Sequence, residues 1–332
     1  GEGSGREVYE ELIRLKILIN CTSIDQLRLL ALCKGKQCSV RINPGEGHGA
    51  NTQTNTGGPS SKHGIYFDQL DTVKSIAKQS QIKIVAIHSH IGSGTDLDHW
   101  LRIKDKTLAL ADQFEDITAI NLGGGLPVVY DSEHEASMPL REWGAALAES
   151  MGAYSRKRGR DIQLQLEPGR YIVAESGVLL AEAQAVKSTT ATDGGVDYNF
   201  IIVNTGMNHN IRPALYGSYH PIRFVSMQQD VVAGPNESYV VAGYLCESGD
   251  VFTTDSGGVL QPRDLYHVSV GDIMVMAGVG AYSHALKSEY NSMNLPASVL
   301  IGADGTSHLI ERRGTLDDVM RREADTAHFQ TL

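Results

Sequence analysis

The sequence has little of several features that mark common protein classes. Its four cysteines show no CxxC spacing, which argues against a disulfide framework or a cysteine-rich zinc site and favours reduced thiols in the cytoplasm. No apolar run has membrane-spanning length and no signal peptide is recognisable, so we expect no membrane partner. Lysine and arginine form no run, and 29 basic against 39 acidic residues give a net charge of −10, which disfavours a nucleic-acid partner.

Glycine, in contrast, is concentrated where one short apolar run ends. Residues 119–125 read Ala-Ile-Asn-Leu-Gly-Gly-Gly. Because glycine lacks Cβ, consecutive backbone amides can approach an anion closely, which predicts a phosphate site. A tight turn with no ligand is the alternative, and a glycine-rich turn alone does not decide between them. The GxGxxG spacing of a dinucleotide site is missing here.

Apolar strand patterns alternate with helical patterns in the first half of the chain. The patterns predict helices over 6–15, 23–32, 67–79, 99–114 and 139–156, and strands over 17–20, 39–43, 83–90, 119–122 and 162–167. This alternation is typical of a parallel α/β sheet, in which functional residues gather at the C-terminal ends of the strands. A polar loop running to about residue 64 is long enough that we expect it to cover a site.

From about residue 176 the pattern changes to short strands. We predict strands over 178–186, 198–203, 238–242, 273–276, 297–301 and 307–311, with turns near 193–195 and 303–305 and a closing helix over 315–327. The prediction is therefore a β/α domain over 1–175 and a mostly antiparallel β-domain over 176–332. Only about five βα units are present, whereas a closed barrel needs eight. Either the sheet is open, or a segment outside this sequence completes it.

Two strand ends carry side chains suited to chemistry. His88 and His90 alternate on one strand, so both should lie on one face. They could be zinc ligands, polar residues lining the site, or, for one imidazole, a surface that stacks on a planar ligand whose phosphate Ser93 holds. Glu167 could be a general base, an ion-pair partner of Arg170, or the partner of a protonated ring nitrogen. Pyridoxal phosphate needs such a carboxylate, a flat stacking surface and a phosphate site.

Six motifs in this order resemble the diaminopimelate decarboxylase family, a fold-type III group of pyridoxal-phosphate decarboxylases. They lie at 88–94, 121–125, 167–177 (EPGRYIVAESG), 211–220 (IRPALYGSYH), 246–252 (CESGDVF) and 290–292. The resemblance implies an alanine-racemase-like β/α barrel, incomplete in this sequence, followed by a β-domain. It also implies pyridoxal 5′-phosphate as cofactor, an amino-acid substrate and a homodimer with a shared active site.

The resemblance implies a role for each matching residue. His90 would stack on the pyridine ring, and Glu167 would pair with its nitrogen. The residues implied to hold the phosphate are Ser93, Gly123, Gly124, Gly125 and Gly169. The residues implied to bind substrate carboxylates are Arg170, Arg212 and Tyr216. Cys246 and Glu247 would reach the neighbouring protomer's site, as proton donor near Cα and as ligand of the distal amine, and Tyr290 would lie beside the cofactor. Each residue also has an alternative role when it is taken singly. Arg212 could pair with an acidic side chain, Cys246 could be an inert core thiol, and Tyr290 could be an aromatic residue that only packs.

One expected residue is missing. The family's Schiff-base lysine lies on an early barrel strand, and its motif is absent, so we expect that about the first three βα units are not in this sequence. The available lysines lie in predicted helices, loops or N-terminal strand ends: Lys16, Lys34, Lys36, Lys62, Lys74, Lys78, Lys83, Lys104, Lys106, Lys157, Lys187 and Lys287. Lys62 is the least unsuitable, yet a mobile loop is a poor place for a desolvated amine.

The leading hypothesis is a decarboxylase that converts meso-diaminopimelate to L-lysine and carbon dioxide. The alternatives are a decarboxylase of another diamino acid, a non-catalytic relative that binds the ligand without a lysine, and a metal-dependent hydrolase that uses His88 and His90.

Overall fold

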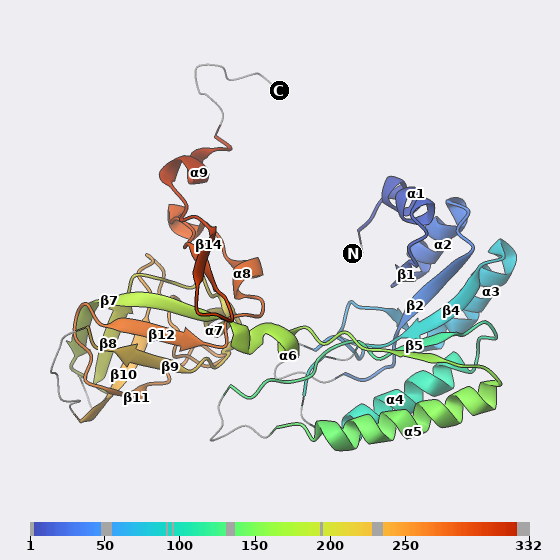
Figure 1. Cartoon of the computed structure of the whole chain (residues 1–332), viewed down its shortest axis with the longest axis horizontal. Helices are drawn as coiled ribbons and strands as arrows, with labels where there is room; N and C mark the ends of the chain where they lie inside the picture. The colour runs from blue at the N-terminus through green and yellow to red at the C-terminus, as the bar shows by residue number, and fades with distance from the viewer. Residues whose placement is uncertain are drawn as a thin grey trace. The chain divides into compact units, whose positions relative to one another are not determined.

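The computed structural model describes residues 3–47, 55–90, 92–94, 96–130, 137–192, 195–227 and 235–323. The chain divides into two compact units, Gly1–Ile172 and Val173–Leu332, each with its own elements (Figure 1). The predicted turn near 193–195 and the end of the predicted closing helix lie partly outside the described residues.

The first unit is built on a parallel sheet. Its strands lie in the order β1 (Asn20–Cys21), β2 (Gln37–Asn43), β4 (Lys83–His88), β5 (Ala119–Asn121) and β6 (Gln163–Gln165). A short strand β3 (Ile65–Tyr66) pairs with the end of β2, and every pair in the sheet is parallel. The predicted parallel α/β class is confirmed. Within the described residues β1 and β6 have one strand neighbour each, so this sheet is open.

The helices of this unit begin and end at recognisable signals. They are α1 (Arg6–Arg14), α2 (Ile24–Leu32), α3 (Leu70–Ser80) after the 3₁₀ turn η2 (Phe67–Gln69), α4 (Leu97–Ala111) and α5 (Leu140–Arg158). Ser23 caps α2 by accepting from the amide of Gln26, and Asp96 caps α4 in the same way. The helix α5 ends at Gly159, whose φ of 64° suits glycine.

Apolar side chains on both faces of the strands form the core of the first unit. Val40, Ile42, Ile87 and Ile120 are at most 1% exposed. Strands of a parallel sheet are covered on both faces, which explains why these runs are apolar throughout and do not alternate. The helices α4 and α5 lie side by side (Figure 1), with the rings of Trp100 and Trp143 edge to face at 5.7 Å.

The first strand is shorter than its apolar pattern predicts. We expected a strand over 17–20, but β1 begins at Asn20, so that prediction is wrong in its bounds. Lys16 has a φ of 58°, and the amide of Ile17 donates to the carbonyl of Leu12 over 2.9 Å. These residues close the C-terminus of α1 in a Schellman-type cap, so they cannot be strand residues. Ile17 is consequently 51% exposed.

The second unit holds a mixed sheet and a hairpin. The strands β7 (Val178–Thr189), β8 (Tyr198–Val203), β9 (Ile222–Val225), β10 (Asn236–Ala242), β11 (Arg263–Tyr266) and β12 (Ile273–Ala277) follow the order β11-β10-β8-β7-β12-β9. All pairs are antiparallel except β8 with β10, and the end strands β9 and β11 approach each other. The mostly antiparallel β-domain is confirmed, although β9 and β11 were not predicted.

Shorter elements complete this unit. The strands β13 (Ser298–Ile301) and β14 (Ser307–Glu311) form the hairpin. Single-turn helices are α6 (Arg170–Val173), which crosses the unit boundary, η3 (Ala174–Ser176), α7 (Arg212–Tyr216), α8 (Ser283–Leu286), η4 (Tyr290–Ser292) and α9 (Leu316–Met320). The core packs around Ile201, Val203, Val241, Met274 and Met276, each fully buried.

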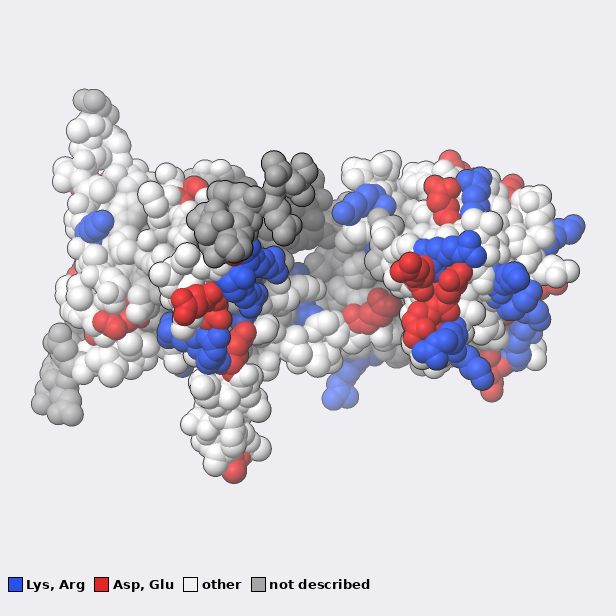
Figure 2. Space-filling view, turned by 90° about the horizontal axis from the view of Figure 1, so that it is seen from above, with Lys and Arg blue, Asp and Glu red and all other residues white. Residues whose placement is uncertain are grey.

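Charge of both signs is present on the face of the molecule that Figure 2 draws. On the face drawn in Figure 2, basic and acidic side chains lie next to each other in both units and do not gather into a patch of one sign. Among the described helices, none combines the length and the apolar character that a membrane span requires.

Candidate cofactor and substrate site

The glycine turn after β5 brings three strand ends into close contact. Gly123 and Gly125 have φ of 69° and 104°, which other residues rarely adopt. A Cβ on Gly123 would lie 2.5 Å from Nδ1 of His90, and one on Gly125 would lie 1.8 Å from the carbonyl oxygen of Gly92. A Cβ on Gly124 would meet the carbonyl oxygen of Glu167 at 2.2 Å. Glycine at all three positions therefore lets the ends of β4, β5 and β6 meet.

His90 is held in one tautomer by this turn. The amide of Gly124 donates to Nδ1 of His90 over 2.9 Å, so Nδ1 accepts and the ring proton lies on Nε2. Burial, reinforced by the nearby guanidinium of Arg41, lowers the pKa of His90 to about 4. The imidazole is thus neutral near pH 7. The residue lies two positions beyond the end of β4, although we had predicted that the strand extends to it.

Glu167 is oriented by a residue that the sequence analysis did not single out. Asn121, the last residue of β5, donates from Nδ2 to Oε1 of Glu167 over 2.8 Å. Its Oδ1 accepts from the amide of Gly123 over 2.8 Å, and the amide of Glu167 donates to the carbonyl of Gly123 over 2.8 Å. Asn121 therefore links the glycine turn to the carboxylate. A polar amide directly before the glycines, at the end of an apolar strand, was the available signal.

His88 lies close to the same carboxylate. Its Nε2 is 3.8 Å from Oε2 of Glu167, and its Nδ1 accepts from Nδ2 of Asn20 at the end of β1 over 2.7 Å. Burial lowers the pKa of His88 despite the opposing effect of Glu167. The described residues contain no group of three or more histidine, cysteine or acidic side chains placed to hold a metal ion. The two histidine Nδ1 atoms are instead engaged by Asn20 and Gly124.

The long loop after β2, which is described over 44–47 and again from residue 55, is fixed to the strand ends. Asn43 donates from Nδ2 to the carbonyl of Gly58 over 2.8 Å and accepts from the amide of Gly58 over 2.9 Å. The hydroxyl of Thr56 donates to the carbonyl of His90 over 3.1 Å. The loop therefore lies against the ends of β2 and β4, where the candidate site is. Residues 48–54 are outside the described chain.

Other predicted residues of the first unit lie in the same region. Ser93 is half-buried in the segment 92–94, whose Gly92 carbonyl contacts the glycine turn. Gly169 is exposed, and a Cβ placed on it would have no atom within 4 Å. Arg170 starts α6 directly after it and is half-buried. The backbone at Gly169 therefore leaves room for a ligand.

Arg212 and Tyr216 form a cluster in the second unit. Arg212 is 5% exposed, and its guanidinium carbon lies 5.5 Å from the ring centre of Tyr216 and 5.3 Å from that of Tyr282. Its Nη2 donates to the hydroxyl of Ser218 over 3.1 Å. Aromatic rings and a fixed hydroxyl hold the planar fork in one orientation, as recognition of a carboxylate requires.

Cys246, Glu247 and Tyr290 lie near one another in the second unit. Cys246 and Glu247 are exposed on the turn after β10, and the hydroxyl of Tyr290 donates to Oε2 of Glu247 over 3.2 Å. This hydrogen bond raises the pKa of Tyr290. The residue implied to lie beside the cofactor and the residue implied to bind the distal amine are therefore hydrogen-bonded within one chain.

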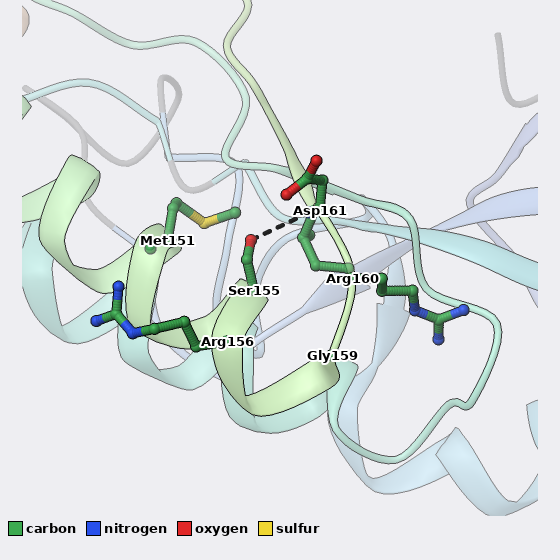
Figure 3. Close-up of a pocket in the computed structure, with 8 residues that line it drawn as sticks. Met151, Ser155, Arg156, Gly159, Arg160 and Asp161 are labelled. Atoms are coloured by element: carbon green, nitrogen blue, oxygen red, sulfur yellow. Dashed lines mark hydrogen bonds between the residues drawn. The ribbon is translucent and has the colours of Figure 1, made fainter.

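A surface depression of about 560 Å³ lies away from these residues (Figure 3). It is lined by the end of α5 and by residues 159–162, including Arg156 and Arg160, and Ser155 there accepts from the amide of Ile162. This is the N-terminal end of β6, whereas Glu167 follows its C-terminal end. None of the predicted site residues lines this depression.

The sequence matches known families over both units. Residues 6–174 match the pyridoxal binding domain of pyridoxal-dependent decarboxylases, and residues 127–280 match the C-terminal sheet domain of the same group. The chain belongs to the pyridoxal-dependent decarboxylases. This agrees with the predicted family, and the cofactor of such a domain is pyridoxal 5′-phosphate.

Individual decarboxylases of this family are similar to the chain over most of its length. It is 37% identical over 324 residues to the diaminopimelate decarboxylase of Escherichia coli K12, covering 95% of the chain and 74% of that protein. The diaminopimelate decarboxylase of Streptomyces coelicolor is 36% identical over 329 residues, covering 96% of the chain and 71% of that protein.

Solved structures of this family resemble the fold. A crystal structure of diaminopimelate decarboxylase matches with a TM-score of 0.87 at 35% identity, covering 97% of this chain and 75% of that one. The Helicobacter pylori enzyme in complex with L-lysine matches with a TM-score of 0.81 at 27% identity, covering 97% of this chain and 77% of that one.

The residues of this decarboxylase chain fit the cofactor in most respects. A Cβ on Gly169 would meet no atom within 4 Å, so the backbone there leaves room for a ligand. His90 is a neutral ring beside the glycine turn, and Glu167 is a carboxylate at a neighbouring strand end. In the described part of the chain, no lysine lies at the C-terminal end of a parallel strand: Lys83 begins β4, Lys62 is exposed in a loop and Lys187 lies within β7.

Proposed function

We propose that the protein that carries this chain is a pyridoxal-phosphate-dependent carboxy-lyase that converts meso-diaminopimelate to L-lysine and carbon dioxide, in the cytoplasm. The observation that carries the proposal is the joined set of Gly124, His90, Asn121 and Glu167 at three strand ends. The similarity to diaminopimelate decarboxylases over at least 95% of the chain supports the choice of substrate.

The residues of the first unit would bind and orient the cofactor. The amides of Gly125 and Gly169 and the hydroxyl of Ser93 would hold its phosphate. The amides of Gly123 and Gly124, which were also predicted to hold it, donate instead to Asn121 and His90 and so fix the shape of the turn. The neutral imidazole of His90 would cover one face of the ring, and Glu167, oriented by Asn121, would keep a proton on the ring nitrogen. A pyridoxal group protonated there supplies an electron sink for the charge left when carbon dioxide departs.

The residues of the second unit would select the substrate and move a proton. Arg212 and Tyr216, together with Arg170 of the first unit, would bind the substrate carboxylates through planar, charge-assisted hydrogen bonds. Glu247 would bind the distal ammonium group, and the thiol of Cys246 would deliver a proton to Cα. A substrate with a second charged end at the right distance is selected because that end pairs with Glu247, whereas a substrate without it leaves the carboxylate unpaired.

The active site would be shared between two protomers of a homodimer, with Cys246 and Glu247 acting in the neighbouring site. Mixing two inactive variants, His90→Ala and Cys246→Ala, tests this. If each site takes residues from both protomers, mixed dimers contain one intact site and regain activity. Dimers that contain one copy of each variant and stay inactive would show that each site uses a single chain.

The function is tested on the protein loaded with pyridoxal phosphate. Incubation with meso-diaminopimelate should release carbon dioxide and L-lysine in equal amounts, measured by trapping and mass spectrometry. Activity on another diamino acid alone would change the substrate assignment. Borohydride reduction followed by peptide mapping identifies the lysine that bears the cofactor, and a protein that binds the cofactor with no labelled lysine and no decarboxylation would be the non-catalytic relative.

A further inference from the structure

The turn that carries Cys246 and Glu247 is closed by backbone hydrogen bonds to one residue. It connects the end of β10 with Val251, which pairs with Ala242 in an antiparallel bridge. The amide of Gly243 donates to the carbonyl of Asp250 over 2.8 Å, and the amide of Asp250 donates to the carbonyl of Glu247 over 3.1 Å. Asp250 is therefore the last residue of the turn and the point where its two ends meet.

The side chain of Asp250 makes two further hydrogen bonds. Its Oδ2 accepts from the amide of Leu245 over 2.8 Å, directly before Cys246. Its Oδ1 accepts from the amide of Met207 over 2.6 Å, in the segment that follows β8. The carboxylate thus ties the middle of the turn to a separate part of the second unit.

The carboxylate is buried at a cost. Asp250 is 3% exposed, and none of the described basic side chains forms an ion pair with it. Burial raises the pKa of Asp250, while the amides of Leu245 and Met207 act in the opposite direction. A buried carboxylate without a counter-ion depends on its hydrogen bonds, so the amides of Leu245 and Met207 are the contacts that hold Asp250 in this place.

Two glycines make room for this carboxylate. A Cβ on Gly243 would lie 2.2 Å from Oδ2 of Asp250, and a Cβ on Gly206 would lie 2.7 Å from the same oxygen. The turn and the segment after β8 can therefore approach the carboxylate only because both positions lack a side chain. The close approach is what allows the short hydrogen bonds to both backbones.

We propose that Asp250 is a positioning residue, whose buried carboxylate fixes the backbone at Leu245 and thereby the placement of Cys246 and Glu247. The roles given to Cys246 and Glu247 rest on the proposed function. The two hydrogen bonds of the Asp250 carboxylate, which we call the clamp, do not. Glu247 in turn accepts the hydroxyl of Tyr290, so the clamp holds the whole cluster in register. Positions that must be accurate to well under an ångström need such support from residues that do not touch the substrate.

The chain offers a matched control in Asp272. It is 4% exposed, belongs to the same unit, and accepts from the amides of Ser269 over 2.8 Å and Met227 over 3.3 Å. Its turn leads into β12 and carries none of the predicted site residues. Asp272→Asn therefore removes a similar interaction in a different place.

The experiment compares Asp250→Asn with Asp272→Asn in the holoenzyme by amide hydrogen exchange and steady-state kinetics. Asparagine has one accepting oxygen where aspartate has two, and its NH2 group cannot accept. One of the two hydrogen bonds to the amides of Leu245 and Met207 is therefore lost. We expect exchange over 244–249 to become about tenfold faster in Asp250→Asn only, since a charge-assisted hydrogen bond closes the turn. We also expect kcat to fall and KM to rise, together lowering kcat/KM about tenfold or more.

Each outcome decides the proposal. Unchanged exchange over 244–249, equal changes in both variants, or faster exchange with unaltered kcat/KM would overturn it. If Asp250→Asn does not fold, Gly206→Ala replaces it. The new Cβ would lie 2.7 Å from Oδ2 and would push the carboxylate away from the two amides, while Asp250 itself is unchanged. A parent protein inactive on diaminopimelate would refute the proposed function, while the exchange comparison would still decide whether the clamp orders the turn.

Discussion

The amide of Gly124 donates to Nδ1 of His90 over 2.9 Å, joining two residues 34 positions apart in the sequence. The bond fixes which ring nitrogen carries the proton and holds the imidazole beside the glycine turn. It also joins two motifs that the sequence analysis could only place on neighbouring strands. The tautomer of His90 and its position beside the glycine turn therefore depend on this hydrogen bond.

The first prediction concerns stability in mild acid. Burial lowers the pKa of His90 to about 4, below the value of 6.5 for a free imidazole, so between these values the unfolded chain binds more protons than the folded one. Stability is therefore full above pH 6.5 and is lost as the pH falls toward 4, by on the order of 3 kcal/mol. Denaturant titrations across this range measure it.

The variant His90→Gln is the control for that prediction. Glutamine does not titrate, so the pH dependence between 6.5 and about 4 should become shallower. His88 shifts in the same direction and will keep part of the slope, so the double variant with His88→Gln should be shallower still. An identical slope in the parent and both variants would contradict the assignment.

The second prediction concerns the glycine turn. In Gly125→Ala the new Cβ would overlap the carbonyl oxygen of Gly92 at a backbone φ of 104°, so we expect a loss of about 2–4 kcal/mol in stability and weaker cofactor binding. The control is Gly144→Ala, inside α5 with nothing within 4 Å, which should gain about 0.5–1 kcal/mol. Chemical denaturation and a cofactor titration report both effects.

The third prediction concerns Glu167 and Asn121. Glu167→Gln keeps the shape but cannot hold a proton on the ring nitrogen, so decarboxylation should fall by about 10² or more while the cofactor still binds. Asn121→Ala removes the hydrogen bond to Oε1 and should cause a smaller fall, roughly tenfold. The exposed acid Glu175 gives the control Glu175→Gln, for which we expect no change. Equal activity of Glu167→Gln and the parent would rule out the assigned role.

The fourth prediction concerns Tyr290 and Glu247. Because the phenol donates to the carboxylate, Tyr290→Phe and Glu247→Gln should not be additive in their effects on KM for a substrate with a distal amine. We expect the double variant to differ from the product of the single effects by roughly threefold. A double-mutant cycle on KM measures the coupling, and strict additivity would show that the two side chains act independently.

The sequence by itself determined which segments are strands of a parallel sheet and which residues lie at their C-terminal ends. Apolar runs alternating with helical patterns are local signals, and parallel strands bring their C-terminal ends to one edge. For that reason His90, the glycine turn and Glu167 could be predicted to lie together. The change to short strand patterns after residue 176 likewise indicated the β-domain, although β9 and β11 carry too weak a local pattern to be predicted.

Only the tertiary structure decided how these residues are held. That Asn121 bridges to Glu167, that Gly124 fixes the tautomer of His90, and that Asp250 clamps the turn of Cys246 all depend on strand register and on contacts between distant segments. The late start of β1, at Asn20 and not at Ile17, was decided by the hydrogen bonds that cap the C-terminus of α1. Local periodicity carries no information on such hydrogen bonds, because their partners are brought together only when the sheets and loops have packed.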